Sequence, residues 1–277
     1  MFSKNHEEHI GHLDEVLTLL QEAGIKLKLK KCFFFRDEVE YLGFRIRPGT
    51  LSASPDAKAR AAINIATFPT TPTQMKSFLG CCNVYRRFIK GFAKVSTPLT
   101  DMLKKDSGTD WGDDLVPTEP QRKAFETLKE ALVTPPILAL PKRGRPYMVD
   151  CDASAYAVGA VLLQQQDEKD EKSWATIGYY SKTLTKEQRN YSASERECYA
   201  VVWSTLTLRP YLEGSHFKVR TDHNALKWML TLNDPSGRLM RWRLRLMEYD
   251  YEIVYRPGLK HQVPDALSRL PRPDSQP

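Results

Sequence analysis

The sequence predicts an α/β protein whose N-terminal part is α+β in character. In the second half, three short apolar strand patterns precede an amphipathic helix, and a further strand and further helices follow, which is typical of a mixed sheet. A proline-rich stretch at 134–145 separates this half from a first half that carries several helix start signals. The 277 residues, 41% of them hydrophobic, are enough for two domains with buried cores.

Apolar periodicity and turn residues divide the first half into helices and strands. In chain order we expect a helix at 6–24, strands at 25–30 and 39–46, a turn at 47–49, and a helix from Pro55 that ends before Pro69. Two later helices share one start signal, a Thr N-cap with Pro in the first turn and Gln three residues after the cap. These starts are Thr71-Pro72-Thr73-Gln74 and Thr118-Glu119-Pro120-Gln121.

The second half alternates strand and helix patterns. Ser192 and Glu195 form a capping box that opens a helix running to about Arg209. The expected strands are 147–152, 159–164, 177–181, 217–221 and 249–255. The other expected helices are 225–232, 239–246 and 264–270, with a polar, proline-rich tail after them.

Charge and cysteine content narrow the functional class. Lys and Arg number 41 against 34 Asp and Glu, so the net charge is +7, which suits a polyanionic partner such as nucleic acid as well as simple solubility. The five cysteines form no CxxC pair and are odd in number, which favours a reduced intracellular setting over a disulfide framework. No apolar run approaches the length of a membrane span.

Four widely separated carboxylates suggest one site assembled by folding. Asp152 and Asp222 end predicted strands, Glu197 lies early in the helix between them, and Asp265 follows a proline near the end of the chain. Oxygen ligands without His or Cys are the set that Mg²⁺ prefers. Such a cluster holds two divalent ions about 3.5–4 Å apart, which activate water in phosphodiester hydrolysis. Asp222 and Asp265 also sit where helix caps are expected.

Two of these positions have a competing neighbour. Asp150 points to the same strand face as Asp152, and one of the two could be a solvated edge charge. We favour Asp152 as the ligand because it ends the strand. Glu195 is the third residue of the capping box opened by Ser192, so Glu197 is the better ligand, although a carboxylate there also snorkels to solvent at many helix edges.

Long motifs in both halves resemble one family. CDASAYAVGAVLLQ, YYSKTLTKEQRNYSASERECYAVVW, RPYLEGSHFKVRTDHNALKWM and YRPGLKHQVPDALSRL resemble the RNase H domain of gypsy-type LTR retrotransposon Pol polyproteins. Residues 2–105 resemble the preceding end of the reverse transcriptase palm and the thumb. The resemblance implies a mixed five-stranded sheet with flanking helices, preceded by a partial palm and a helical thumb. The expected domains are palm 1–54, thumb 55–110, connector 111–145, RNase H-like domain 146–270 and tail 271–277.

The resemblance also implies the catalytic and metal-binding residues. Asp152 matches the Asp of the DAS motif, Glu197 the Glu at the head of the long helix, Asp222 the Asp of TDH, and Asp265 the Asp of the DALSR segment. The family often has Ala before the last of these, where this chain has Pro264. Two Mg²⁺ ions, or Mn²⁺ as a substitute, are the implied cofactors.

A nucleic-acid surface is implied in the first half. The segment at 41–44 resembles the primer grip, a hairpin that places a primer end, where Gly43 permits close approach of the backbone. The helix after residue 71 resembles part of the thumb, with Arg side chains against the phosphates of a duplex. Phe78 and Phe88 are more typical of a helix core. The candidate nucleic-acid-binding residues are Tyr41, Leu42, Gly43, Phe44, Asn83, Tyr85, Arg86 and Arg87.

The implied function is an RNase H-type endonuclease that cuts the RNA strand of RNA–DNA hybrids. The alternative is a non-catalytic nucleic-acid-binding remnant of a retroelement. The family's polymerase has a Tyr-x-Asp-Asp turn just before the segment that begins here with Met1-Phe2-Ser3, so we expect no polymerisation from this chain alone. The implied partners are hybrid and duplex nucleic acid and the rest of the Pol polyprotein, including upstream palm and fingers and the integrase, but no membrane. The implied location is a cytoplasmic retroelement particle, with the nucleus as the alternative.

Overall fold

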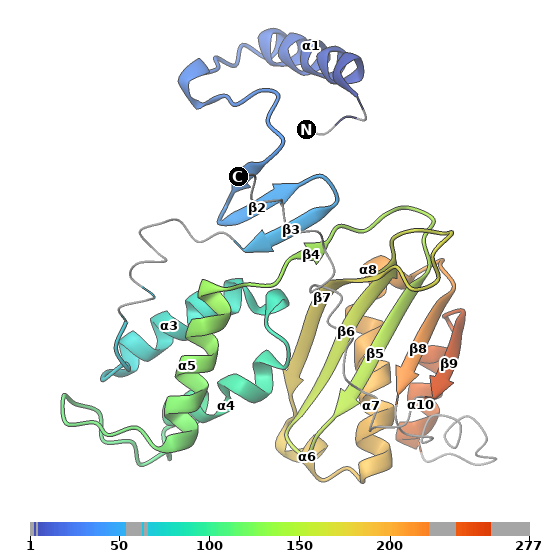
Figure 1. The fold of residues 1–277 in the computed structure, drawn as a ribbon. Helices are drawn as coiled ribbons and strands as arrows, with labels where there is room; N and C mark the ends of the chain where they lie inside the picture. Colours follow the sequence, from blue (N-terminus) through green and yellow to red (C-terminus); the bar gives the residue numbers. More distant parts are fainter. Residues whose placement is uncertain (1–2, 4, 54–62, 64–65, 222–236, 256–277) are drawn as a thin grey trace, which may run out of the picture. The chain divides into compact units, whose positions relative to one another are not determined.

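The computed structural model describes residues 3, 5–53, 63, 66–221 and 237–255 (Figure 1). The chain divides into two compact units, Met1–Glu38 and Val39–Pro277, and each is described by itself. Several expected elements lie outside the described residues: the helix from Pro55, the helices at 225–232 and 264–270, and the tail at 271–277.

The N-terminal unit contains the expected helix, α1 (His6–Glu22). Asn5 caps it, since its side-chain oxygen accepts a 2.8 Å hydrogen bond from the Glu8 backbone N–H. The strand expected at 25–30 is wrong, because a short 3₁₀ helix, Leu29–Lys31, occupies its end. Alternating apolar residues make a strand only where a second strand accepts the backbone hydrogen bonds, and no described residue pairs with this segment.

The second unit begins with a small antiparallel sheet of strands β1 (Val39–Tyr41), β2 (Phe44–Arg47), β3 (Thr50–Ala53) and β4 (Leu138–Ala139), in that order. The expected single strand at 39–46 is a hairpin, because the chain turns at residues 42–43. The turn expected at 47–49 is confirmed, with Arg47 paired to Thr50 across it.

Gly43 is required at the β1–β2 turn for two physical reasons. Leu42 and Gly43 have φ angles of 50° and 81°, the left-handed pair that a two-residue hairpin favours. A Cβ atom on Gly43 would also lie 2.4 Å from the Tyr85 hydroxyl oxygen. The close approach that the sequence predicts at this glycine is thus made by a tyrosine of the same chain.

We therefore expect Gly43→Ala to lower the free energy of unfolding by roughly 2–3 kcal/mol, the sum of backbone strain and displacement of Tyr85. Gly49→Ala is the matched control, because Gly49 has a φ of 73° but no atom near the added Cβ. That variant should lose only the strain, about 1 kcal/mol. Denaturant unfolding of both variants measures the difference, and equal losses would show that Tyr85 moves without cost.

A helical segment, residues 72–133, packs next to the small sheet. Its elements are α3 (Pro72–Val84), the 3₁₀ helix η2 (Arg86–Phe88), α4 (Phe92–Met102) and α5 (Glu119–Val133). Both expected start signals are confirmed, with 3.2 Å from the Gln74 N–H to the Thr71 hydroxyl and 2.8 Å from the Thr118 N–H to the Gln121 side chain. Phe88 is buried and Phe78 contacts Phe125, so the expected helix-core role of both is confirmed.

The large sheet contains the five strands β5 (Tyr147–Ala153), β6 (Ala157–Gln165), β7 (Trp174–Thr183), β8 (Phe217–Thr221) and β9 (Tyr251–Tyr255). Their order is β7-β6-β5-β8-β9, with β5 antiparallel to β6 and parallel to β8. The expected mixed five-stranded sheet is confirmed. The longest strand, β7, is an edge strand of this sheet.

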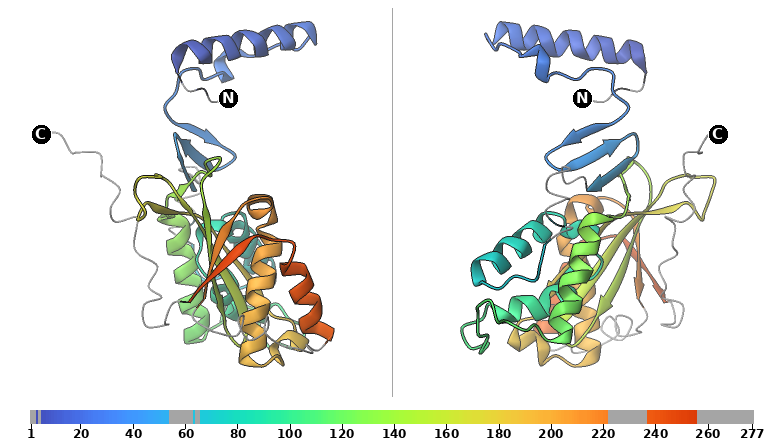
Figure 2. Two further views of the ribbon diagram at one scale, coloured as in Figure 1. Left: turned by 90° about the vertical axis from the view of Figure 1, so that its right-hand side faces the viewer. Right: turned by 60° about the vertical axis from the view of Figure 1, so that its left-hand side comes forward.

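Helices flank the large sheet (Figures 1 and 2). They are α6 (Lys186–Arg189), α7 (Ala193–Thr207), α8 (Arg209–Leu212) and α10 (Gly237–Leu246). α7 packs on β5 and β6 through a core that includes Val149, Leu162 and Val201. Leu239, Trp242 and Leu246 bury the inner face of α10. In the described ranges, no helix has the length and apolar character needed to cross a membrane.

The stretch expected to be a connector is tied to both sheets. β4 lies within it and pairs with β3. Gln164, which is fully buried on β6, exchanges two 2.7 Å hydrogen bonds with the Lys142 backbone, donating from Nε2 to the carbonyl and accepting at Oε1 from the N–H. The proline-rich composition therefore marks an irregular path that still has fixed contacts.

Candidate metal centre at the end of a central strand

Asp152 is the penultimate residue of β5, and its side chain is exposed. Asp150, two residues earlier, is buried and forms a bidentate ion pair with Arg220 of the neighbouring strand β8, with 2.6 Å between Arg220 Nε and Asp150 Oδ1. The two side chains lie opposite each other in the parallel register. Arg220 therefore neutralises Asp150, whereas the described residues supply no hydrogen-bond or ion-pair partner to Asp152.

Glu197 lies in the second turn of α7 and is half-buried, with its Oε2 atom shielded from solvent. Glu195 has the capping role that the sequence predicts, because its carboxylate accepts a 2.9 Å hydrogen bond from the Ser192 N–H. It also pairs with Arg238 of α10. Partial burial acts to raise the pKa of Glu195, but the hydrogen bond from Ser192 and the Arg238 guanidinium together hold that pKa below its usual value.

Two buried thiols, Cys151 and Cys198, lie next to this site in the chain. Burial raises the pKa of the Cys151 thiol to about 12, and the carboxylates of Asp150, Glu197 and Asp152 raise that pKa as well. Burial likewise raises the pKa of Cys198 to about 12, and Glu197 again contributes. Because both thiols are buried between the sheet and α7, the side-chain donors open to a metal here are carboxylate oxygens. Such a set fits Mg²⁺ or Mn²⁺ rather than a softer metal.

The other two predicted carboxylates, Asp222 and Asp265, lie outside the described residues. The described part of the chain contains no cluster of three His, Cys, Asp or Glu side chains able to hold a metal ion. β8 ends at Thr221 and runs parallel to β5. The C-terminal ends of these two neighbouring strands therefore lie side by side at the same end of the sheet. The full ligand set stays a prediction.

The candidate nucleic-acid residues of the hairpin fall into two groups. Tyr41 and Leu42 are exposed, by 62% and 75% of their surface. Phe44 instead packs into the helical segment, with its ring centroid 5.7 Å from that of Tyr85 and 5.9 Å from that of Phe88. Tyr85 itself is buried. Contact with nucleic acid stays a prediction for these residues, and the ring contacts give Phe44 and Tyr85 a packing role.

Asn83 is exposed, but the two arginines that follow it are used within the chain. Arg86 Nη1 donates to the Asn83 side chain at 3.3 Å, and its Nη2 donates to the Ser181 carbonyl on β7 at 2.6 Å. Arg87 Nη2 donates to the Ile177 carbonyl at 3.1 Å. These contacts hold the guanidinium groups against the large sheet, so the phosphate contact expected for them would compete with bonds inside the chain.

Sequence reasoning missed the arginines that neutralise the neighbouring acids, Arg220 for Asp150 and Arg238 for Glu195. For Arg220 the signal was only partial, since the strand FKVRT carries two alternating cations, Lys218 and Arg220, and the sequence does not say which of them meets a buried acid. Arg238 carries no comparable signal, because its partner is 43 residues away on another helix.

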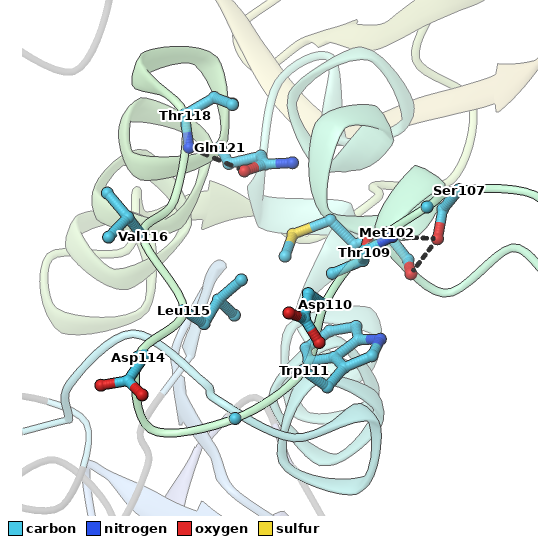
Figure 3. Close-up of a pocket in the computed structure, with 12 residues that line it drawn as sticks. Met102, Ser107, Thr109, Asp110, Trp111, Asp114, Leu115, Val116, Thr118 and Gln121 are labelled. Carbon is cyan, nitrogen blue, oxygen red and sulfur yellow. Dashed lines mark hydrogen bonds between the residues drawn. The ribbon is translucent and has the colours of Figure 1, made fainter.

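A cavity of about 550 Å³ lies between α4 and the start of α5, and its lining includes none of the candidate metal ligands (Figure 3). Met102, Trp111 and Leu115 supply apolar lining, and Asp110 and Asp114 supply acidic groups. The Gln121 side chain at its wall is engaged in the helix cap. Its lining contains hydroxyl groups but no basic residue beside them to activate one, and we assign it no role in catalysis.

Comparison with known proteins agrees with this fold. Residues 142–249 match the family model of an RNase H-like domain found in reverse transcriptase, and residues 1–46 match that of reverse transcriptase (RNA-dependent DNA polymerase). The solved foamy viral protease-reverse transcriptase in complex with an RNA/DNA hybrid aligns with a TM-score of 0.74 at 22% identity, over 100% of this chain and 36% of that one. The complex with dsDNA gives 0.74 at 21% identity, over 93% and 53%. These likenesses concern the fold.

Sequence relatives place the chain in a larger context. It is 37% identical over 272 residues to the retrovirus-related Pol polyprotein from transposon 297 of Drosophila melanogaster, covering 98% of this chain and 24% of that protein. It is 35% identical to the transposon Tf2-3 polyprotein of Schizosaccharomyces pombe, covering 97% and 20%. The chain thus spans about a quarter or less of these relatives. Its matched domains and relatives together show that it belongs to the retrotransposon Pol polyproteins, as a reverse transcriptase segment followed by an RNase H-like domain.

Proposed function

We propose that this chain is an RNase H-type endonuclease that cuts the RNA strand of RNA–DNA hybrids by two-metal hydrolysis. The observation that carries the proposal is the contrast on β5: Asp150 is neutralised by Arg220, and Asp152, at the strand's end, is exposed. The exposed carboxylate of Asp152 is therefore the one of the two that is available to bind a metal ion. Glu197 lies on the helix that packs against the same strand.

Asp152 and Glu197 would hold the divalent ions, together with Asp222 and Asp265. When bound, Mg²⁺ supplies an activated water and stabilises the leaving oxygen of the phosphodiester. The chain's own contribution would be to place the ligand carboxylates and to occupy the acids beside them. Arg220 and Arg238 serve this by binding Asp150 and Glu195, which prevents these two acids from competing for the cation.

Selection of a hybrid would come from the duplex rather than from base sequence. Contacts to 2′-hydroxyls on one strand distinguish RNA from DNA, and a duplex is recognised by its shape. The net charge of +7 favours association with such a polyanion. The foamy viral relative of known structure, bound to an RNA/DNA hybrid, supports this choice of substrate. The remaining Pol polyprotein is the expected partner in the native context.

Metal removal tests the proposal directly. We expect the chain with Mg²⁺ to cut labelled RNA in a hybrid, and to leave the DNA strand, double-stranded DNA and double-stranded RNA intact. A chelator should abolish cutting, and added Mg²⁺ or Mn²⁺ should restore it, while binding to the hybrid persists throughout. Salt-sensitive binding without cutting under any metal would support the non-catalytic remnant instead.

A further inference from the structure

The strongest unexplained feature lies at residues 86–93, where the helical segment meets the edge strand of the large sheet. The guanidinium groups of Arg86 and Arg87 donate to two carbonyls of β7, those of Ser181 and Ile177. These contacts join positions 90 or more residues apart in the sequence. A hydrogen bond from a charged donor is stronger than one between neutral groups, so two of them form a substantial attachment.

A third contact lies at the same place. The Ala93 backbone N–H donates a buried 2.9 Å hydrogen bond to the Ser181 hydroxyl oxygen. The Arg86 guanidinium also lies over the Phe92 ring, 5.3 Å from its centroid, a cation–π contact. Together these contacts cover part of an edge strand whose backbone would otherwise pair with other chains.

Ser181, the residue of β7 that both Arg86 and Ala93 contact, lies in cross-strand register with the candidate metal ligand Asp152. Asp152 pairs with Gly159 on β6, and Gly159 pairs with Ser181 on β7. Two strand spacings, roughly 10 Å, therefore separate the Asp152 and Ser181 backbones. Residues paired across strands point to the same face, so both side chains lie on one side of the sheet. The helical segment is thus anchored close to where cutting is proposed.

We propose that Arg86 and Arg87 form a clasp that holds the helical segment and the large sheet as one rigid body, so that a hybrid lying along the helical segment is presented to Asp152. This proposal rests on the proposed function, which supplies the RNA–DNA hybrid as the substrate. In this role the two arginines are positioning residues: they act through the placement of the helical segment and of Asn83, which Arg86 orients. A short hybrid centred on Asp152 makes few contacts with the helical segment, and a long one extends further along it.

The test uses the full chain with Arg86→Met and Arg87→Met combined, and hybrids of about 8 and about 20 base pairs. In the unchanged chain we expect a lower KM for the long hybrid. The variant should raise KM for the long hybrid roughly tenfold and leave its kcat and the KM of the short hybrid unchanged. Amide hydrogen exchange at 86–95 and 177–183 should accelerate roughly tenfold or more as the attachment opens.

Two further variants distinguish positioning by the clasp from a general attraction between positive charge and phosphate. The chain with both arginines replaced by lysine keeps the positive charge but loses the fork that lets Arg86 bind Asn83 and Ser181 at once. We expect it to resemble the Met variant. If it behaves like the unchanged chain, the arginines act as charges on phosphate and the clasp is overturned. Lys90→Met, an exposed charge nearby, is the control and should change nothing.

The experiments distinguish a failure of the clasp proposal from a failure of the proposed nuclease activity. If the unchanged chain cuts no hybrid, the proposed function fails. The clasp is then decided by exchange rates and by fluorescence anisotropy, in which the variant must lose affinity for the long hybrid only. An unaltered exchange rate together with an unaltered preference for the long hybrid would overturn the clasp whatever the activity.

Discussion

Asp152→Asn should abolish Mg²⁺-dependent cutting of a hybrid while the chain stays as stable as before. The substitution keeps the shape of the side chain and removes the negative charge that a divalent ion needs. A metal ion stabilises the transition state by several kcal/mol, so we expect the rate to fall by roughly 10²–10³-fold or more. Because Asp152 is exposed on the strand end, its loss leaves no buried group unpaired.

The measurement is the initial rate of RNA cleavage, made together with thermal unfolding and hybrid affinity. Asp114→Asn, an exposed acid in the loop before α5, is the matched control and should keep full activity. Unchanged cutting by Asp152→Asn would remove this residue from the metal site. Absence of cutting in both the unchanged chain and the variant, with equal binding, would instead favour the non-catalytic alternative.

Asp150→Ala should produce the opposite result, a large loss of stability. The side chains of Asp150 and Arg220 are 6% and 14% exposed, and their pairing is bidentate. Removing one partner leaves the other charge in a site shielded from water, which typically costs about 3–5 kcal/mol. Denaturant unfolding measures this loss. Activity of the fraction that stays folded should persist, because Asp150 is not proposed to bind metal.

A double-mutant cycle isolates the ion pair from other effects. Arg220→Met alone should also destabilise the chain, and the combination with Asp150→Ala should recover much of the loss, because no buried charge remains. Strictly additive losses would mean that the two side chains stabilise the fold independently. A severe loss of cutting by Asp150→Ala in fully folded protein would show that this acid does more than bind Arg220.

The elements that local chemistry determines were predictable from sequence. The capping boxes at Thr118 and Ser192 begin helices where expected, and the apolar strand patterns locate the five strands of the large sheet along the chain. The choice of Glu195 as a cap follows from the same local rule. Such features depend on residues within one or two turns of each other, so one sequence contains all the information needed.

Features that depend on distant partners were not predictable in this way. The segment at 25–30 has strand periodicity but acquires no pairing among described residues. The resemblance to a thumb helix predicts phosphate contacts for Arg86 and Arg87, and only the folded chain places β7 against them. Asp222 and Asp265 lie outside the described residues, so their contribution to the site stays a prediction.

The two hydrogen bonds between the Gln164 side chain and the Lys142 backbone limit where this chain can be truncated. A shortened polypeptide that starts at the first strand of the large sheet would leave a buried amide with lost partners, a defect that costs more than an exposed one. Recombination or protease trimming just before residue 146 should therefore yield a fragile product. The smallest stable unit is therefore larger than the five-stranded sheet and its helices, and it includes the segment around Lys142 that precedes the first strand.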